Sequence, residues 1–169
     1  MGLLAKELKA WISLEVLSVR SNILEGVISQ AQLSNFPKLY YLDLSYNSFT
    51  LNINFDWVPP FQLEVLYLRS CKLGPDFPNW IKTQRNLSIL DVSCNEISNT
   101  IPTWFWDTPS SLQYLNLSYN QIKGRLPNIS TKFRNLILLD LSSNRFESPL
   151  PIISSNLTSL NLSKNKFSG

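Results

Sequence analysis

Histidine is missing from this chain of 169 residues, and cysteine, methionine and glycine are scarce, with two, one and five copies. Without histidine the chain has neither a Ser-His-Asp triad nor a histidine base. Two cysteines and no histidine cannot complete a zinc site, so we expect no metal. No glycine-rich phosphate loop is present, and we expect no cofactor. These absences argue against an enzyme.

Long apolar runs and clusters of charge are lacking as well. No stretch approaches the ~18 uncharged apolar residues that would cross a bilayer. The opening residues, MGLLAKELKAWIS, carry Lys6, Glu7 and Lys9 where a signal peptide needs an apolar run, so the chain as given has no secretion signal. The net charge of +3 is spread without runs, which does not fit a nucleic-acid partner.

One short phrase, L-x-x-L-x-L-x-x-N-x-L, recurs seven times at intervals of 21 to 25 residues. Its L-x-L core alternates apolar and polar residues, as a half-buried strand requires. A single unit cannot close a core with three leucines, so neighbouring units must stack and bury a shared one. The pattern predicts an α/β solenoid of leucine-rich repeats: a right-handed horseshoe with a parallel sheet on its concave face and loops or 3-10 segments on its convex face.

The asparagine slot of the phrase has a predicted structural role. Where each strand turns away, backbone N–H and C=O groups lose their sheet partners, and a side-chain amide can serve both kinds of group. The predicted ladder comprises Asn22, Asn47, Cys71, Asn95, Asn120, Asn144 and Asn165. Cys71 should be buried in this ladder, whereas Cys94, one residue before the slot of the next repeat, should be exposed near the turn. Because their side chains point to different sides of the backbone, we expect two free thiols.

The repeats extend over residues 14–169, which we expect to form one domain of about seven units. Residues 1–13 should form a short helical lead-in that imitates the outer half of a preceding repeat. Solenoids need capping units with a polar outer face, and neither end of this sequence supplies one. This favours a fragment or a truncated copy of a longer protein.

Three runs of sequence are more specific than the repeat itself: W-V-P-P-F-Q-L at 57–63, S-C-K-L-G-P-D-F-P-x-W at 70–80 and I-P-T-W-F-W at 101–106. With them the chain, from about Leu14 to its C-terminus, closely resembles the ectodomain of plant leucine-rich-repeat receptor-like proteins. The resemblance implies an extracellular position at the plasma membrane, a role in defence or development, and signalling through a co-receptor kinase. The family's signal peptide, paired-cysteine caps and membrane span have no counterpart here.

Two other interpretations stay open. A soluble apoplastic protein resembling polygalacturonase inhibitors would bind a pathogen enzyme directly, although those inhibitors keep both cysteine caps. A truncated, non-signalling decoy would keep the repeats without the other parts of a receptor. In each case the expected partner is a protein or a peptide.

Strand residues that face away from the core should line the concave surface. Those departing from the repeat's L-D-L-S phrase are the most informative, and Tyr and Arg most often dominate binding energy. The predicted ligand-binding site comprises Arg20, Tyr41, Asp43, Tyr67, Arg69, Asp91 and Tyr114. The carboxylates of Asp43, Asp91 and Asp140 should stand two strands apart, at roughly 9.5 Å, which is too wide for a shared metal. On an open, solvated face their pKa values would also be untuned for catalysis.

Five N-x-S/T sequons are candidate N-glycosylation sites, namely Asn86, Asn116, Asn128, Asn156 and Asn161. Asn116 and Asn161 belong to the strand phrase L-N-L-S, where a glycan would block the concave face. Asn86, Asn128 and Asn156 are therefore the preferred candidates.

Overall fold

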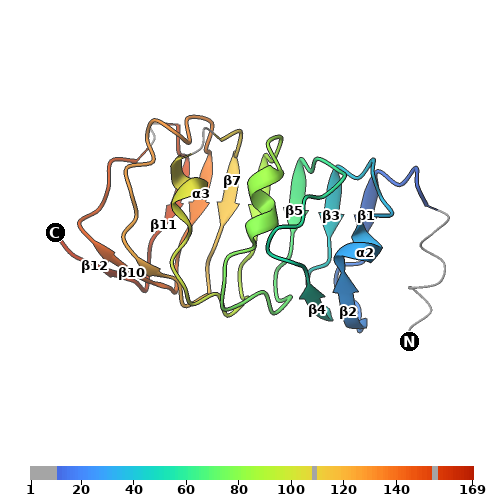
Figure 1. Ribbon diagram of the computed structural model, residues 1–169. Coiled ribbons are helices and arrows are strands. Elements are labelled where there is room, and N and C mark those ends of the chain that lie inside the picture. The colour runs from blue at the N-terminus through green and yellow to red at the C-terminus, as the bar shows by residue number, and fades with distance from the viewer. Residues whose placement is uncertain (1–10, 108–109, 154–155) are drawn as a thin grey trace.

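A parallel sheet runs the length of the molecule and confirms the predicted solenoid (Figure 1). The computed structural model describes residues 11–107, 110–153 and 156–169. Most of the predicted lead-in, residues 1–10, therefore lies outside the described residues, and residues 12–13 form part of a turn. The sheet order is β1 (Val16–Ser18), β3 (Tyr41–Asp43), β5 (Val65–Tyr67), β6 (Ile89–Asp91), β7 (Tyr114–Asn116), β9 (Leu138–Asp140) and β11 (Ser159–Asn161).

Each strand is built on the second leucine of its repeat, and these leucines stack in register. Leu66 pairs with Leu42 on one side and with Leu90 on the other. A parallel sheet of this kind places equivalent residues of successive repeats side by side, because each repeat makes one turn of the solenoid. The predicted strand positions are therefore confirmed.

The other side of each coil contains short helices and a second set of strands. The helices are α2 (Gln30–Leu33), η2 (Asn79–Thr83) and α3 (Thr103–Asp107). Strands β2 (Glu25–Ser29) and β4 (Ser48–Asn52) pair with each other, and β8 (Lys123–Gly124), β10 (Arg145–Ser148) and β12 (Lys166–Phe167) form a small parallel sheet. These strands were not expected from the sequence. They form because extended segments of successive coils lie beside each other after the asparagine slot.

The core is a single apolar column that passes through all the central coils. Leu42, Leu66, Leu90, Leu115 and Leu139 are fully buried, and aromatic side chains fill the half of the core farther from the sheet. The Phe105 ring, for example, packs at 4.9 Å from Phe77 and at 5.9 Å from Phe133, measured between ring centroids. The outermost strands are less protected, because each has a neighbour on one side only among the described residues.

The asparagine side chains bridge consecutive coils inside the molecule. Asn120 donates from Nδ2 to the carbonyl of Val92 in the preceding repeat at 3.0 Å, and to two carbonyls of its own turn. Its Oδ1 accepts the backbone N–H groups of Asn95 and Ile97 at 2.9 and 3.1 Å. Asn95 and Asn144 are buried and bonded to both coils in the same way. Asn22, in the first repeat, is exposed, and among the described residues it donates only within its own turn.

Cys71 interrupts this ladder. Its thiol faces the carbonyl oxygens of Leu44 and Arg69 at 3.6 and 3.7 Å, the two positions to which an asparagine amide would donate. Burial, with a smaller contribution from the Asp43 carboxylate, raises the pKa of the Cys71 thiol to about 12, so the group stays protonated. Both cysteines are free and Cys71 is buried, as the sequence predicted, whereas Cys94 is half-buried rather than exposed.

Replacing Cys71 with asparagine should stabilise the protein. The new amide would donate to the Leu44 and Arg69 carbonyls, and a hydrogen bond of this kind contributes about 1 kcal/mol net. We expect the urea midpoint of Cys71→Asn to rise, while that of the control Cys71→Ala falls. A lower midpoint for Cys71→Asn would mean that this part of the core is shaped for sulfur and cannot accept the extra atom.

Candidate ligand-binding surface

The sheet brings the predicted site residues together over its strands, but it exposes them to different degrees. Arg20 is exposed, and Tyr41, Tyr67, Arg69 and Tyr114 are half-buried. The rings of Tyr41 and Tyr67 lie 6.2 Å apart between centroids, on the adjacent strands β3 and β5. Tyr114 stands further along the sheet on β7 and its hydroxyl accepts from Asn116 Nδ2 at 3.5 Å. The three tyrosines thus lie on β3, β5 and β7, within a run of four neighbouring strands.

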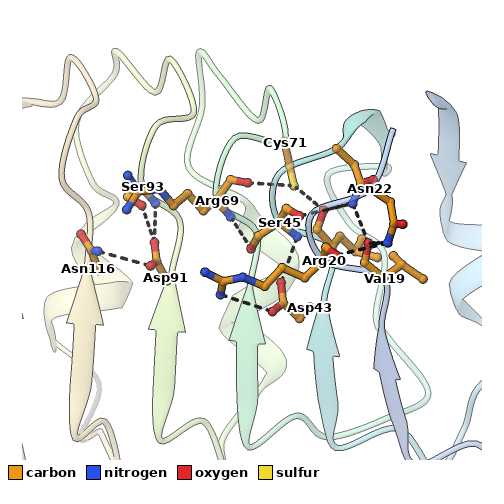
Figure 2. Close-up of polar contacts among 12 residues, drawn as sticks. Val19, Arg20, Asn22, Asp43, Ser45, Arg69, Cys71, Asp91, Ser93 and Asn116 are labelled. Carbon is orange, nitrogen blue, oxygen red and sulfur yellow. Dashed lines mark hydrogen bonds and ion pairs between the residues drawn. The ribbon is translucent and has the colours of Figure 1, made fainter. Parts of the chain in front are cut away.

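Two of the predicted carboxylates are covered, contrary to the expectation of an open, solvated row. Asp43 and Asp91 are only 2% and 6% exposed. The cause is local: Asp91 Oδ1 accepts the N–H and the hydroxyl of Ser93 at 2.9 and 2.6 Å, and its Oδ2 accepts from Asn116 (Figure 2). Asp43 accepts the Ser45 N–H at 2.9 Å in the same way. These aspartates therefore brace the turn at the end of each strand.

The same bracing explains why the repeat favours L-D-L-S. A carboxylate or amide oxygen in the middle position can accept the N–H two residues later, a local side-chain-to-backbone bond typical of Asp and Asn. Asp140 does so with Ser142 at 2.8 Å. Among the described residues no group of three His, Cys, Asp or Glu side chains could hold a metal ion.

Tyr46 belongs to this surface, and analysis of the sequence did not identify it. The guanidinium carbon of Arg20 lies over its ring at 5.1 Å from the centroid, and that of Arg69 at 5.3 Å. Tyr46 has a positive φ of 57°, as does the residue before the ladder slot in each repeat: Ser21, Tyr46, Ser70, Cys94, Tyr119, Ser143 and Lys164. The tyrosine lies outside the strand, where the alternation rule does not apply. The sequence did contain one indication of this contact: an aromatic residue, Tyr46, occupies the position just before the ladder asparagine.

Burial favours the neutral form of two phenols of the site, those of Tyr67 and Tyr114. Burial raises the pKa of Tyr67, and nearby Tyr41 raises it further. Burial also raises the pKa of Tyr114, although the hydrogen bond from Asn116 opposes this. Both hydroxyls are therefore protonated at physiological pH and can donate a hydrogen bond to a ligand.

The sequons differ in accessibility. Asn86, Asn128, Asn156 and Asn161 are exposed, whereas Asn116 is 6% exposed. The Asn116 amide oxygen accepts from Ser118 at both its N–H and its hydroxyl, and its Nδ2 donates to Asp91. Because a glycan on Asn116 Nδ2 would have to displace the groups that cover this side chain, its burial adds a reason to prefer Asn86, Asn128 and Asn156. Glycan occupancy stays a prediction.

The described helices are short. None of them has the length and apolar character that a membrane span requires.

Stacked coils, an internal asparagine ladder and a parallel sheet that runs through all the repeats define a leucine-rich-repeat solenoid. Family models of the leucine rich repeat match residues 38–58, 61–122, 85–146 and 154–169. The chain belongs to this family.

Two similar proteins are Receptor-like protein EIX2 and Receptor-like protein EIX1 of Solanum lycopersicum, both 44% identical to this chain. The matches cover 86% and 79% of this chain but only 14% and 13% of those relatives. Among solved structures, the Arabidopsis receptor kinase HAESA in complex with the peptide hormone IDA and the co-receptor SERK1 is 26% identical with a TM-score of 0.72, over 96% of this chain and 27% of that one. The resemblance to plant receptor-like proteins is thus confirmed.

Proposed function

We propose that this chain is a ligand-recognition segment of a plant cell-surface receptor-like protein, and that its concave face binds a peptide or an extended protein segment. The observation that carries the proposal is the row of aromatic and arginine side chains on strands β3 and β5 and on the turns that follow β1, β3 and β5. Tyr and Arg provide large contact area and strong polar contacts, and they dominate the energetics of many interfaces.

The similar proteins support a receptor role in general, but they do not identify the ligand. The relatives are receptor-like proteins, and HAESA shares the fold and binds a peptide hormone together with a co-receptor. By extension we propose that the whole protein acts in immune or developmental signalling on the extracellular side of the plasma membrane, with a partner kinase. The two receptor-like relatives favour this interpretation over a soluble enzyme inhibitor.

A selection experiment tests the proposal without knowledge of the natural ligand. The immobilised chain is used to select from a library of random peptides, and the enriched peptides are measured against Tyr67→Ala/Arg69→Ala. We expect binding to weaken at least tenfold, because buried aromatic and arginine anchors commonly contribute ~2 kcal/mol or more each. The urea midpoint should change little, because both side chains are at the surface of the sheet.

The matched control is Phe55→Ala/Arg85→Ala, which removes an exposed aromatic residue and an exposed arginine outside the seven-stranded sheet. This variant should bind the selected peptides as the unmodified chain does. Equal binding by the Tyr67/Arg69 variant, or the absence of any enriched peptide, would contradict the proposed site.

A further inference from the structure

A pocket of about 470 Å³ lies on the flank of the solenoid, along the segments that lead from η2 to β6 and from α3 to β7. Three successive coils line this flank pocket, and Val58, Ile81 and Phe105 are one member from each. None of the described residues that line it belongs to the seven-stranded sheet, so the pocket is separate from the concave face. Its volume falls within the range of small-molecule sites, roughly 300–1,000 Å³.

The three runs of sequence that are more specific than the repeat meet at the flank pocket. Val58 and Gln62 in its lining come from the first run, and Trp104 comes from the third, followed by Phe105. The second run provides Phe77, whose ring lies 5.9 Å from that of Trp104 and 4.9 Å from that of Phe105, between centroids. The concave site proposed above uses none of these runs, so it does not account for them.

Side-chain amides hold two of the three coils together around the flank pocket. Gln62 Nε2 donates to the Thr83 carbonyl at 3.0 Å, and Gln62 Oε1 accepts the Arg85 N–H at 3.1 Å. The buried Gln84 side chain accepts the Leu63 N–H at 2.8 Å. These amides are bonded to the protein itself, so the walls are formed before any ligand arrives, which lowers the cost of binding.

The flank pocket combines an apolar floor with positive charge at its rim. The buried side chains of Ile81, Leu87 and Phe105 form the floor. Lys82 and Arg85 are exposed, and neither side chain has an ion pair or hydrogen bond with another described residue. No Asp or Glu is among the described residues of the lining. A pocket lined by charge of one sign attracts a ligand of the opposite sign.

We propose that the flank pocket binds a small organic anion, a ligand of low molecular mass with an aromatic or branched apolar body and one acidic group. The apolar body would lie on the floor against Phe105, and the acidic group would lie between Lys82 and Arg85. A glycan at Asn86 would begin outside the pocket, because Asn86 does not line it although its neighbours Arg85 and Leu87 do. This site is additional to the proposed peptide-binding function and does not depend on it.

Two fluorescent dyes that differ by one acidic group test this proposal. Anilinonaphthalene sulfonate carries the acidic group, and phenylnaphthylamine has the same rings without it. The complete chain is titrated with each dye, and binding is followed by the rise in dye fluorescence. Lys82→Gln/Arg85→Gln should weaken binding of the sulfonate dye about tenfold, because charge-assisted contacts are lost, and should change binding of the neutral dye by less than about twofold.

Matched variants locate the dye on the protein. Lys38→Gln/Arg145→Gln removes the same charge from exposed residues outside the flank pocket, so it should leave the binding of both dyes unchanged. Val58→Asp places a carboxylate in the lining and should weaken the sulfonate dye at least about threefold by like-charge repulsion. Val27→Asp makes the same change at another exposed valine, outside the pocket, and should affect neither dye.

The neutral dye reports whether the flank pocket is intact in each variant. Selective loss of the sulfonate dye in the Lys82/Arg85 and Val58 variants, with the neutral dye still bound, supports the site. The proposal is wrong if neither dye binds the unmodified chain, or if both variants bind the sulfonate dye as the unmodified chain does. It is also wrong if the Lys82/Arg85 variant loses both dyes equally at an unchanged urea midpoint. The peptide-binding function would stand in each case, because it rests on the concave face.

Discussion

Replacing Leu115 with alanine should lower the free energy of unfolding by about 2–5 kcal/mol. Leu115 is fully buried at the centre of β7, and it pairs in register with Leu90 and Leu139, which are also fully buried. The sheet fixes the distance between these neighbours, so they cannot move in to fill the cavity. Urea unfolding monitored by circular dichroism would measure the loss.

Leu160→Ala is the matched control for this prediction. Leu160 occupies the same slot of the repeat on β11, but it is 45% exposed. Because the cost of removing methyl groups follows the apolar area and the cavity that they leave, this variant should lose clearly less stability. Equal shifts for the two variants would show that the leucine column does not have the graded burial described above.

Replacing Asn120 with alanine should cost about 3 kcal/mol, the upper end for leaving buried polar groups without a partner. The substitution removes three donations to carbonyl oxygens and two acceptances from N–H groups. Several of these groups lie inside the core and cannot turn to water. The loss should appear in the urea midpoint, and amide hydrogen exchange at Asn95 and Ile97 should accelerate because their N–H groups lose an acceptor.

Two further variants make this prediction sharper. Asn22→Ala removes an exposed residue from the same ladder slot. Within the part of the chain that the structure describes, Asn22 makes only two local bonds, so the cost should be well under half as large. Asn120→Asp keeps an oxygen acceptor for the two N–H groups but places a second acceptor oxygen against the three carbonyls, so it should also be destabilising. A cost for Asn22→Ala that equals that of Asn120→Ala would refute the importance of burial at this position.

The architecture followed from the spacing of leucines and asparagines, because a strand in a solenoid needs only local alternation and a repeated turn. The phrase around Leu115 and Asn120 predicted both a strand and its bend. Strand β4 was not predicted, because its pairing with β2 depends on how two coils stack and leaves no clear alternation in either segment. Register between coils is a tertiary property that one repeat cannot encode.

The site was predicted less completely than the fold, for physical reasons that differ between residues. Arg20, Tyr67 and Arg69 stood out because they break the repeat phrase. Asp43 was assigned to a solvated face because alternation gives the direction of a side chain but not what covers it. Tyr46 was missed because a left-handed turn residue follows no strand periodicity, and its position became evident only from the two guanidinium groups over its ring.

The regular spacing of the strands determines where a peptide that lies across the sheet can make equivalent contacts. An extended peptide perpendicular to the strands advances ~3.3 Å per residue, while successive strands are ~4.8 Å apart. Three peptide residues therefore correspond to two strands, the interval that separates Arg20 from Arg69. Side chains of an extended peptide alternate between its two faces, so equivalent side chains face the sheet again only after about six residues and four strands, and a selected sequence should show a periodicity of six.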